Sequence, residues 1–196
     1  MLYPDTQIQY IDIKDGEPRY KTINEFYQEY SHKSKIKISD NVGTTSEIDF
    51  TDMNVKITDL FGWTQVLMVR KIIQKAGIRW ADIVTANKQI LISTGTLVPY
   101  YQKEETNIGF HGEVKHAYVL KNPSKANDND CMRIHNGETF DGNPIEFARQ
   151  EIINTFEGND NYGYEIITKS RFFNANDIHM FGSDHILTDE AVKWYK

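Results

Sequence analysis

The sequence predicts an all-β fold, and two observations support this. Aromatic residues make up 12% of the 196-residue chain, and aromatic side chains favour the half-buried faces of strands. Short segments of alternating polar and apolar residues also recur, separated by turn residues such as Asp15 with Gly16 and Ala76 with Gly77. This pattern is typical of strands joined by tight turns.

One helix is predicted among the strands of the first hundred residues. Thr22 is a suitable N-cap, with Glu25 three residues later and apolar residues at helical spacing, so a short helix is expected over 22–30. The polar segment 31–52 predicts a connection or an irregular edge hairpin. Strands are predicted at 7–13, 18–21, 54–58, 63–73, 78–85 and 88–93.

The second half of the chain contains a segment of different character. Residues 121–130 have the composition of a loop, and residues 144–156 have helical spacing with Pro144 in the first turn, so a second helix is expected there. Further strands are predicted at 163–173 and 176–181, and a short helical tail at 188–196.

The predicted core lies on the alternating faces of these strands. Its expected members are Trp63, Ile83, Ile90, Ile92, Tyr164, Ile166 and Phe172.

Charge and composition exclude several classes of protein. The net charge of −6 argues against general binding of nucleic acid, which needs clustered Lys and Arg. A local basic group, formed by Arg70, Lys71, Lys75 and Arg79, is interpreted as solvated charges around a hairpin. We expect a cytoplasmic protein, because the N-terminus lacks the pattern of a signal peptide and no apolar run approaches the roughly 20 residues that span a bilayer.

Three separated stretches together resemble the conserved blocks of inteins and other Hint domains. Residues 3–26 look like the opening block, with Pro4 where the family has Gly. Residues 59–66 and 83–96 are similar to the Gly-Trp strand and to the second block, which usually ends Thr-x-x-His. The most specific match is residues 163–178, which follow the pattern Tyr-Asp-Ile-x-Thr, then Phe-x-Ala-Asn-Asp-Ile.

The resemblance implies a horseshoe-like Hint β fold with a small α-containing insertion. Its two parts would be residues 1–102 and 161–183, with the insertion at 103–160 and a tail at 184–196. In this fold the first and last blocks share one centre, so Met1 is expected beside Phe181 and Gly182.

The resemblance also implies a set of splicing residues. A Cys or Ser at the first position attacks the preceding peptide carbonyl, and the His of the second block protonates the departing nitrogen. At the C-terminal junction a His-Asn pair precedes a Cys, Ser or Thr, and the Asn cyclises to release the chain.

The sequence lacks most of these groups. Met1, Thr96, Phe181 and Gly182 occupy the positions of nucleophile, general acid, His and Asn, and only the acceptor Ser183 remains. The thioether of Met1 has no acidic proton, and if Met1 is the translation start no peptide bond precedes it. A shift of register by one residue would put Leu97 in place of Thr96, and neither is a general acid at pH 7. We therefore expect no catalytic residues.

No cofactor or metal is expected either. The six histidines do not have the paired spacing of a structural zinc site.

The favoured hypothesis is a non-catalytic, splicing-inactive domain derived from an intein, with a binding or structural role. We expect a protein partner, bound by segments 103–160 and 184–196. The Lys-, Asn- and Ile-rich composition indicates an AT-rich gene, so a viral origin, such as a phage, and a place in the host cytoplasm or the virion are expected. One alternative is a splicing or self-cleaving Hint domain that uses Ser183. Another is a DNA-binding remnant of a homing element that uses the basic hairpin 70–79.

Overall fold

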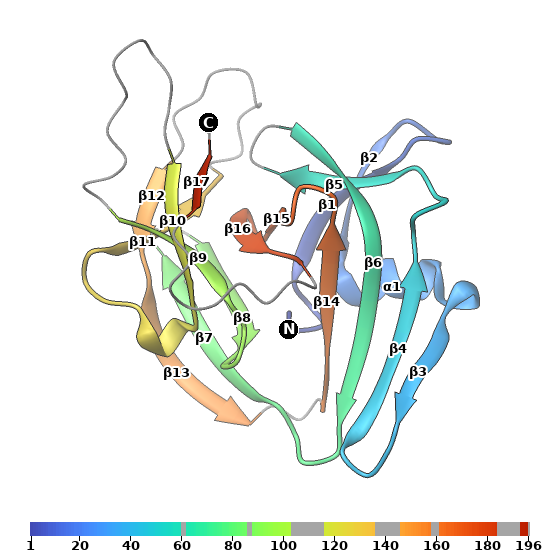
Figure 1. Cartoon of the computed structure of the whole chain (residues 1–196), viewed down its shortest axis with the longest axis horizontal. Helices are drawn as coiled ribbons and strands as arrows, with labels where there is room; N and C mark the ends of the chain where they lie inside the picture. The colour runs from blue at the N-terminus through green and yellow to red at the C-terminus, as the bar shows by residue number, and fades with distance from the viewer. Residues whose placement is uncertain are drawn as a thin grey trace.

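Antiparallel strands dominate the chain. The computed structural model describes residues 1–59, 62–85, 88–102, 116–135, 146–157, 161–183 and 193–195. Within these ranges the strands form three sheets with a single α-helix, so the all-β prediction is confirmed (Figure 1).

The first sheet is built around β6 (Gly62–Gln74), which pairs with three other strands. Its neighbours are β4 (Gly43–Asp49), β5 (Val55–Asp59) and β14 (Tyr162–Thr168). The sheet order is β2-β1-β5-β6-β4-β3, with β1 (Gln7–Asp12), β2 (Pro18–Thr22) and β3 (Lys35–Ser39). The segment 31–52 therefore forms the β3–β4 hairpin, and β3 lies at the edge of the sheet.

Two further sheets contain the other strands. One has the order β13-β7-β8, formed by β13 (Glu151–Glu157), β7 (Arg79–Thr85) and β8 (Lys88–Ser93). The other has the order β15-β16-β11-β9-β10-β17, with β12 (Glu146–Arg149) beside β11 (Asp130–Ile134). Its remaining strands are β9 (Val98–Gln102), β10 (His116–Lys121), β15 (Phe172–Ala175), β16 (Ile178–Phe181) and β17 (Lys193–Tyr195).

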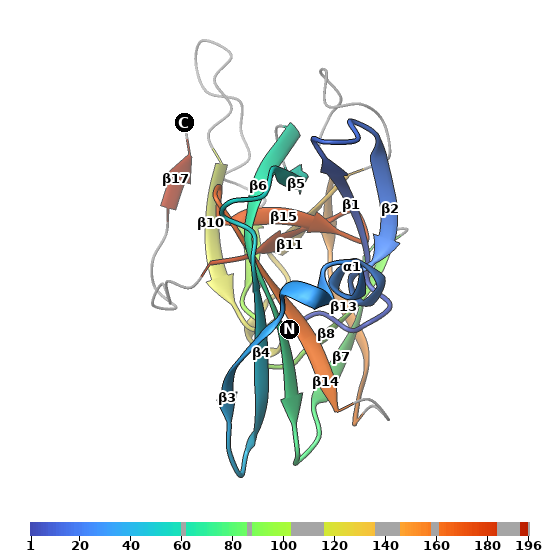
Figure 2. The same cartoon turned by 90° about the vertical axis from the view of Figure 1, so that its right-hand side faces the viewer.

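The predicted N-terminal helix is present as α1 (Ile23–Glu29). Thr22 and Glu25 form a capping box, in which each side chain accepts a hydrogen bond from the backbone N–H of the other residue. The helix buries Phe26, whose ring packs 5.5 Å from that of Phe50. The ring of Phe26 also lies 4.6 Å from that of Tyr10 on β1, so the helix packs against the first sheet beside β1 and β2 (Figure 2).

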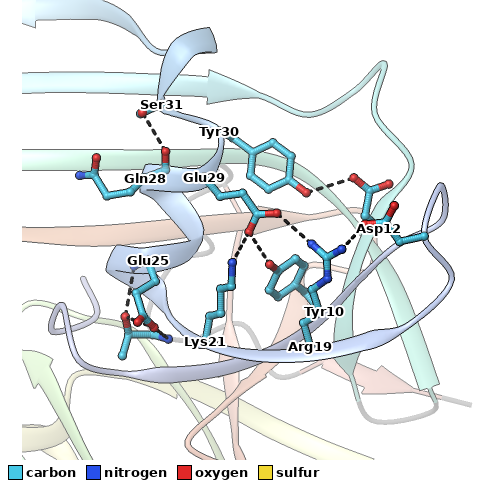
Figure 3. A network of polar contacts seen from close by, with 11 residues as sticks. Tyr10, Asp12, Arg19, Lys21, Glu25, Gln28, Glu29, Tyr30 and Ser31 are labelled. Carbon is cyan, nitrogen blue, oxygen red and sulfur yellow. Dashed lines mark hydrogen bonds and ion pairs between the residues drawn. The ribbon is translucent and has the colours of Figure 1, made fainter.

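A polar network fixes the last turn of α1 to the first hairpin (Figure 3). The carboxylate of Glu29 accepts hydrogen bonds from the Tyr10 hydroxyl at 2.5 Å, from Lys21 at 2.7 Å and from Arg19 at 3.0 Å. Burial alone would raise the pKa of Glu29, but the hydrogen bonds from Lys21 and Tyr10 outweigh it and hold the pKa below its usual value. The charged form of Glu29 is therefore favoured in the folded chain.

The core prediction is confirmed for six of its seven residues and wrong for one. Ile83, Ile90, Ile92, Tyr164, Ile166 and Phe172 are buried. Trp63 is 37% exposed, because Thr64 and Val66 face inward on β6 and alternation turns Trp63 outward. Trp80, on β7, is fully buried.

The helix expected over 144–156 is wrong. Its described residues form β12 and β13, and β13 pairs with β7 along most of its length. Ile152, Ile153 and Thr155 are β-branched and fit a strand, and pairing with β7 outweighs the helical spacing. The structure also contradicts the expected helical tail, since Lys193–Tyr195 is a strand paired with β10, while 184–192 lies outside the described residues.

The predicted strand 163–173 is divided in two. β14 ends at Thr168 and β15 begins at Phe172, and a turn lies between them with Arg171 at a φ of 72°. The strand predicted at 176–181 begins later, as β16, because Asn176 and Asp177 have positive φ and make the turn.

Strands from the segment 103–160 join sheets made by the rest of the chain. β11 pairs with β9 and β16, and β13 pairs with β7. Met132 and Ile134 on β11 are buried in the main core. The division of the chain at residues 103, 160 and 183 stays a prediction, but this segment carries strands where a helix was expected.

Candidate functional site

The start of the chain lies between two strands that are far apart in sequence. Leu2 exchanges two backbone hydrogen bonds with Tyr164 of β14, at 2.7 and 3.0 Å, and forms a further bridge with Ile92 of β8. Figure 1 shows the N-terminus between these strands. Leu2 therefore joins the first sheet to the β7–β8 hairpin.

A cavity of about 440 Å³ lies beside this bridge. It is lined by all five positions singled out from the sequence, namely Met1, Thr96, Phe181, Gly182 and Ser183. The two ends of the conserved pattern thus meet at one place.

Two hydroxyl groups hold the first residue. The amine of Met1 donates hydrogen bonds to the Ser93 hydroxyl at 3.0 Å and to the Thr96 hydroxyl at 2.6 Å. The Ser93 N–H donates to the Met1 carbonyl at 2.9 Å. Burial lowers the pKa of the Met1 amine to about 6, against the opposing charge of Glu165. Ser93 and Thr96 therefore both bind residue 1. They lie three residues apart, as the Thr and the His of the Thr-x-x-His pattern do.

The backbone of Gly182 also lines the cavity. Its N–H donates to the Arg171 carbonyl at 2.8 Å, and its carbonyl accepts from the Thr168 N–H at 3.2 Å. A Cβ atom at this position would lie 2.3 Å from the Ile166 carbonyl oxygen and 2.8 Å from the Phe173 ring. An asparagine side chain therefore has no room here unless the backbone moves.

Comparison with known proteins identifies the fold. No family profile and no curated protein sequence matches the chain. Solved structures do match, among them the transcription factor IIB Mvu mini-intein, with a TM-score of 0.65 at 15% identity over 92% of this chain and 98% of that one. An intein from a hyperthermophile matches with a TM-score of 0.64 at 13% identity over 92% and 98%, and the Pab PolII intein with 0.63 at 14% over 92% and 100%.

The chain has the Hint fold of inteins. The cavity of this Hint fold contains a charged pair of which the sequence singled out only Arg70, as part of the basic hairpin. Arg70 on β6 and Glu165 on β14 both line it, with a guanidinium nitrogen 3.9 Å from the carboxylate. Glu165 occupies the position at which the family pattern has Asp. That match is the one feature of the sequence that could have indicated Glu165. Arg70 also donates to Glu47 at 2.7 Å, so its charge is shared between two carboxylates.

The histidine nearest to the junction in the described part of the chain is His179. His179 is buried on β16, with its ring stacked 4.8 Å from that of Phe172 and its Nδ1 atom 3.8 Å from Asp59. It is not among the residues lining the cavity with Ser183, and His185 lies outside the described residues. Within the described ranges no group of three or more His, Cys, Asp or Glu could hold a metal ion, and the absence of a metal stays a prediction.

The basic side chains of hairpin 70–79 contact other residues of the same chain. Lys71 lies 4.2 Å from the centre of the Tyr162 ring, Lys75 donates to the Asp40 carbonyl at 3.0 Å, and Arg79 donates to the Thr155 hydroxyl at 3.1 Å. These contacts give the DNA-binding alternative no support. No helix in the described part of the chain is long and apolar enough to cross a membrane.

Proposed function

We propose that this chain is a splicing-inactive domain of intein descent, which keeps the Hint cavity and works by binding or as a structural element. The support comes from the side chains that the fold gathers there. Met1 offers a thioether in place of the nucleophile, Thr96 a hydroxyl in place of the general acid and Phe181 a hydrocarbon ring in place of the histidine, and none of these groups can perform the role of the one it replaces.

The observation that carries this proposal is the packing at Gly182. Cyclisation at the C-terminal junction requires a side-chain amide, and the position has neither the amide nor the space for one. The two backbone hydrogen bonds of Gly182 further resist the shift that a larger residue would require. A single substitution would therefore not restore cyclisation.

A fusion experiment tests the proposal. The full chain is placed between two stable domains of different size and incubated at pH 6 to 8, with products followed on a denaturing gel. We expect the fusion protein to stay intact. Release of either flanking domain, abolished by Ser183→Ala, would instead establish the self-cleaving alternative.

A restored variant serves as the positive control. Met1→Cys with Thr96→His rebuilds the N-terminal half, because the side chains at positions 93 and 96 lie beside residue 1, so an added thiol should release the N-terminal domain. Adding Phe181→His and Gly182→Asn should not release the C-terminal domain, because Asn does not fit beside Ile166. Efficient release there would show that the junction is more adaptable than its packing indicates.

The viral origin, the protein partner and the compartment stay predictions.

A further inference from the structure

The edge strand β3 exposes aliphatic side chains. Among the described strands it pairs with β4 alone, and all of its residues are exposed. Ile36 is 69% exposed and Ile38 is 55% exposed. An edge strand presents unpaired backbone donors and acceptors, and a second strand can bind to them.

The same edge is basic, although the whole chain carries a net charge of −6. Lys35 and Lys37 are exposed on β3. Glu47 on β4 lies 3.7 Å from Lys37, but Arg70 binds the same carboxylate more closely, at 2.7 Å. Lysines at an edge oppose its pairing with a like-charged strand, including β3 of another copy.

At the edge of another sheet, β13 has the complementary character. It pairs with β7 alone among the described strands and is exposed along nearly its whole length. Ile152 is 36% exposed and Ile153 is 60% exposed. Exposed Glu151 and Glu157 stand at the two ends of the strand, so this edge is aliphatic and acidic.

We propose that β3 of one copy of this chain pairs antiparallel with β13 of a second copy. In this pairing, placing Lys37 opposite Glu151 also places Ile36 opposite Ile152, so one ionic pair and one aliphatic pair form side by side. The proposal does not depend on whether the chain splices.

The two edges lie far apart on one copy, on opposite outer sides of the molecule (Figure 1). One copy therefore cannot pair its own β3 with its own β13. The contact is heterologous, which means that each added copy leaves one β3 and one β13 open, and rows or rings of copies form.

Sedimentation velocity on the full chain at low salt tests this pairing. We expect an average mass that rises with concentration and falls with added salt. Reversing either edge, with Lys35→Glu and Lys37→Glu or with Glu151→Lys and Glu157→Lys, should weaken association about tenfold or more, and combining all four substitutions should restore it. Lys14→Glu with Lys169→Glu makes the same charge change as the first pair at exposed positions elsewhere and should leave association unchanged.

Hydrogen exchange on the unmodified chain provides a readout that needs no variant. The amides of β3 and β13 should exchange more slowly as the concentration rises. A monomer at every concentration, association that survives reversal of one edge, or protection confined to other strands would each overturn the proposal. So would a folded four-substitution variant that remains monomeric.

Discussion

The amine nitrogen of Met1 lies 2.6 Å from the hydroxyl oxygen of Thr96, 95 residues further along the chain. The Ser93 hydroxyl lies 2.9 Å from the same Thr96 oxygen, so three groups share one small network. We expect Thr96→Val to destabilise the chain by about 1 kcal/mol, because the valine keeps the shape but leaves the amine one partner short. Urea unfolding measures this, with Thr94→Val as the neighbouring control, and equal stabilities would show that the network contributes nothing.

Two glycines of the same cavity should respond in opposite ways to alanine. Gly182→Ala places a methyl group 2.3 Å from a carbonyl oxygen, so a loss of about 1 to 3 kcal/mol is expected from overpacking. At Gly95 a Cβ meets nothing within 4 Å, so Gly95→Ala should be nearly neutral. Thermal unfolding of the two variants side by side decides the matter. If both behave alike, the closed junction at Gly182 is not rigid.

Two tryptophans provide a test of the corrected core. Trp80→Ala should cost about 3 to 5 kcal/mol, since the side chain is fully buried. Trp63→Ala should cost much less, because Trp63 is 37% exposed on the outer face of β6. The free energies of unfolding in urea rank the two, and the reverse order would contradict the observed register of β6.

Acid should weaken the junction between α1 and the first hairpin. The pKa of Glu29 is lowered in the folded chain, so its contribution is present above the unfolded pKa of about 4.3 and is lost as the pH falls below it. Glu29→Gln should therefore be less stable than the parent by about 0.5 to 1 kcal/mol at pH 7, given its partial exposure, and should lose less on acidification.

Unfolding curves at pH 7 and pH 3 measure this difference. Glu17→Gln, at an exposed position of the same hairpin, is the control. Parallel losses in Glu29→Gln and the parent would remove Glu29 as the acid-sensitive group.

Removal of residues 104–158 should prevent folding. The sequence places an insertion at 103–160, and because loop closure depends only weakly on length, that assignment alone would predict that a short linker can replace it. The structure shows that this segment supplies Met132 and Ile134 to the main core and pairs β13 with β7. We therefore expect a Gly/Ser replacement to be insoluble or to lack a cooperative transition, and a well-behaved product would mean that the core tolerates their loss.

The sequence predicts local features of this chain better than distant ones. The capping box of Thr22 and Glu25 depends on residues three apart, and it forms as expected. Residues 144–156 have helical spacing, but they become strands because β7 offers a partner that the local sequence does not contain. The orientation of Trp63 depends on the pairing register of β6, and one step of register exchanges the two faces.

In the candidate site, too, the sequence predicts local features better than distant ones. The spacing of Ser93 and Thr96 matched a known pattern, and both residues do contact Met1. The crowding at Gly182 comes from Ile166 and Phe173, brought in by other turns of the chain, so no local pattern could reveal it. Arg70 reaches the cavity only because β6 pairs with β14.

The pairing of β14 with β6 also has a consequence for synthesis. β14 covers residues 66–73 of β6, and this side of the long strand stays open until residue 168 has left the ribosome. Leu2 likewise cannot form its bridge with Tyr164 until that residue has been synthesised. Contacts this distant in sequence slow folding and leave early strands exposed while they wait. During synthesis of the first half of the chain, β6 therefore has one edge without its native partner strand, and β14 closes that edge only at the end.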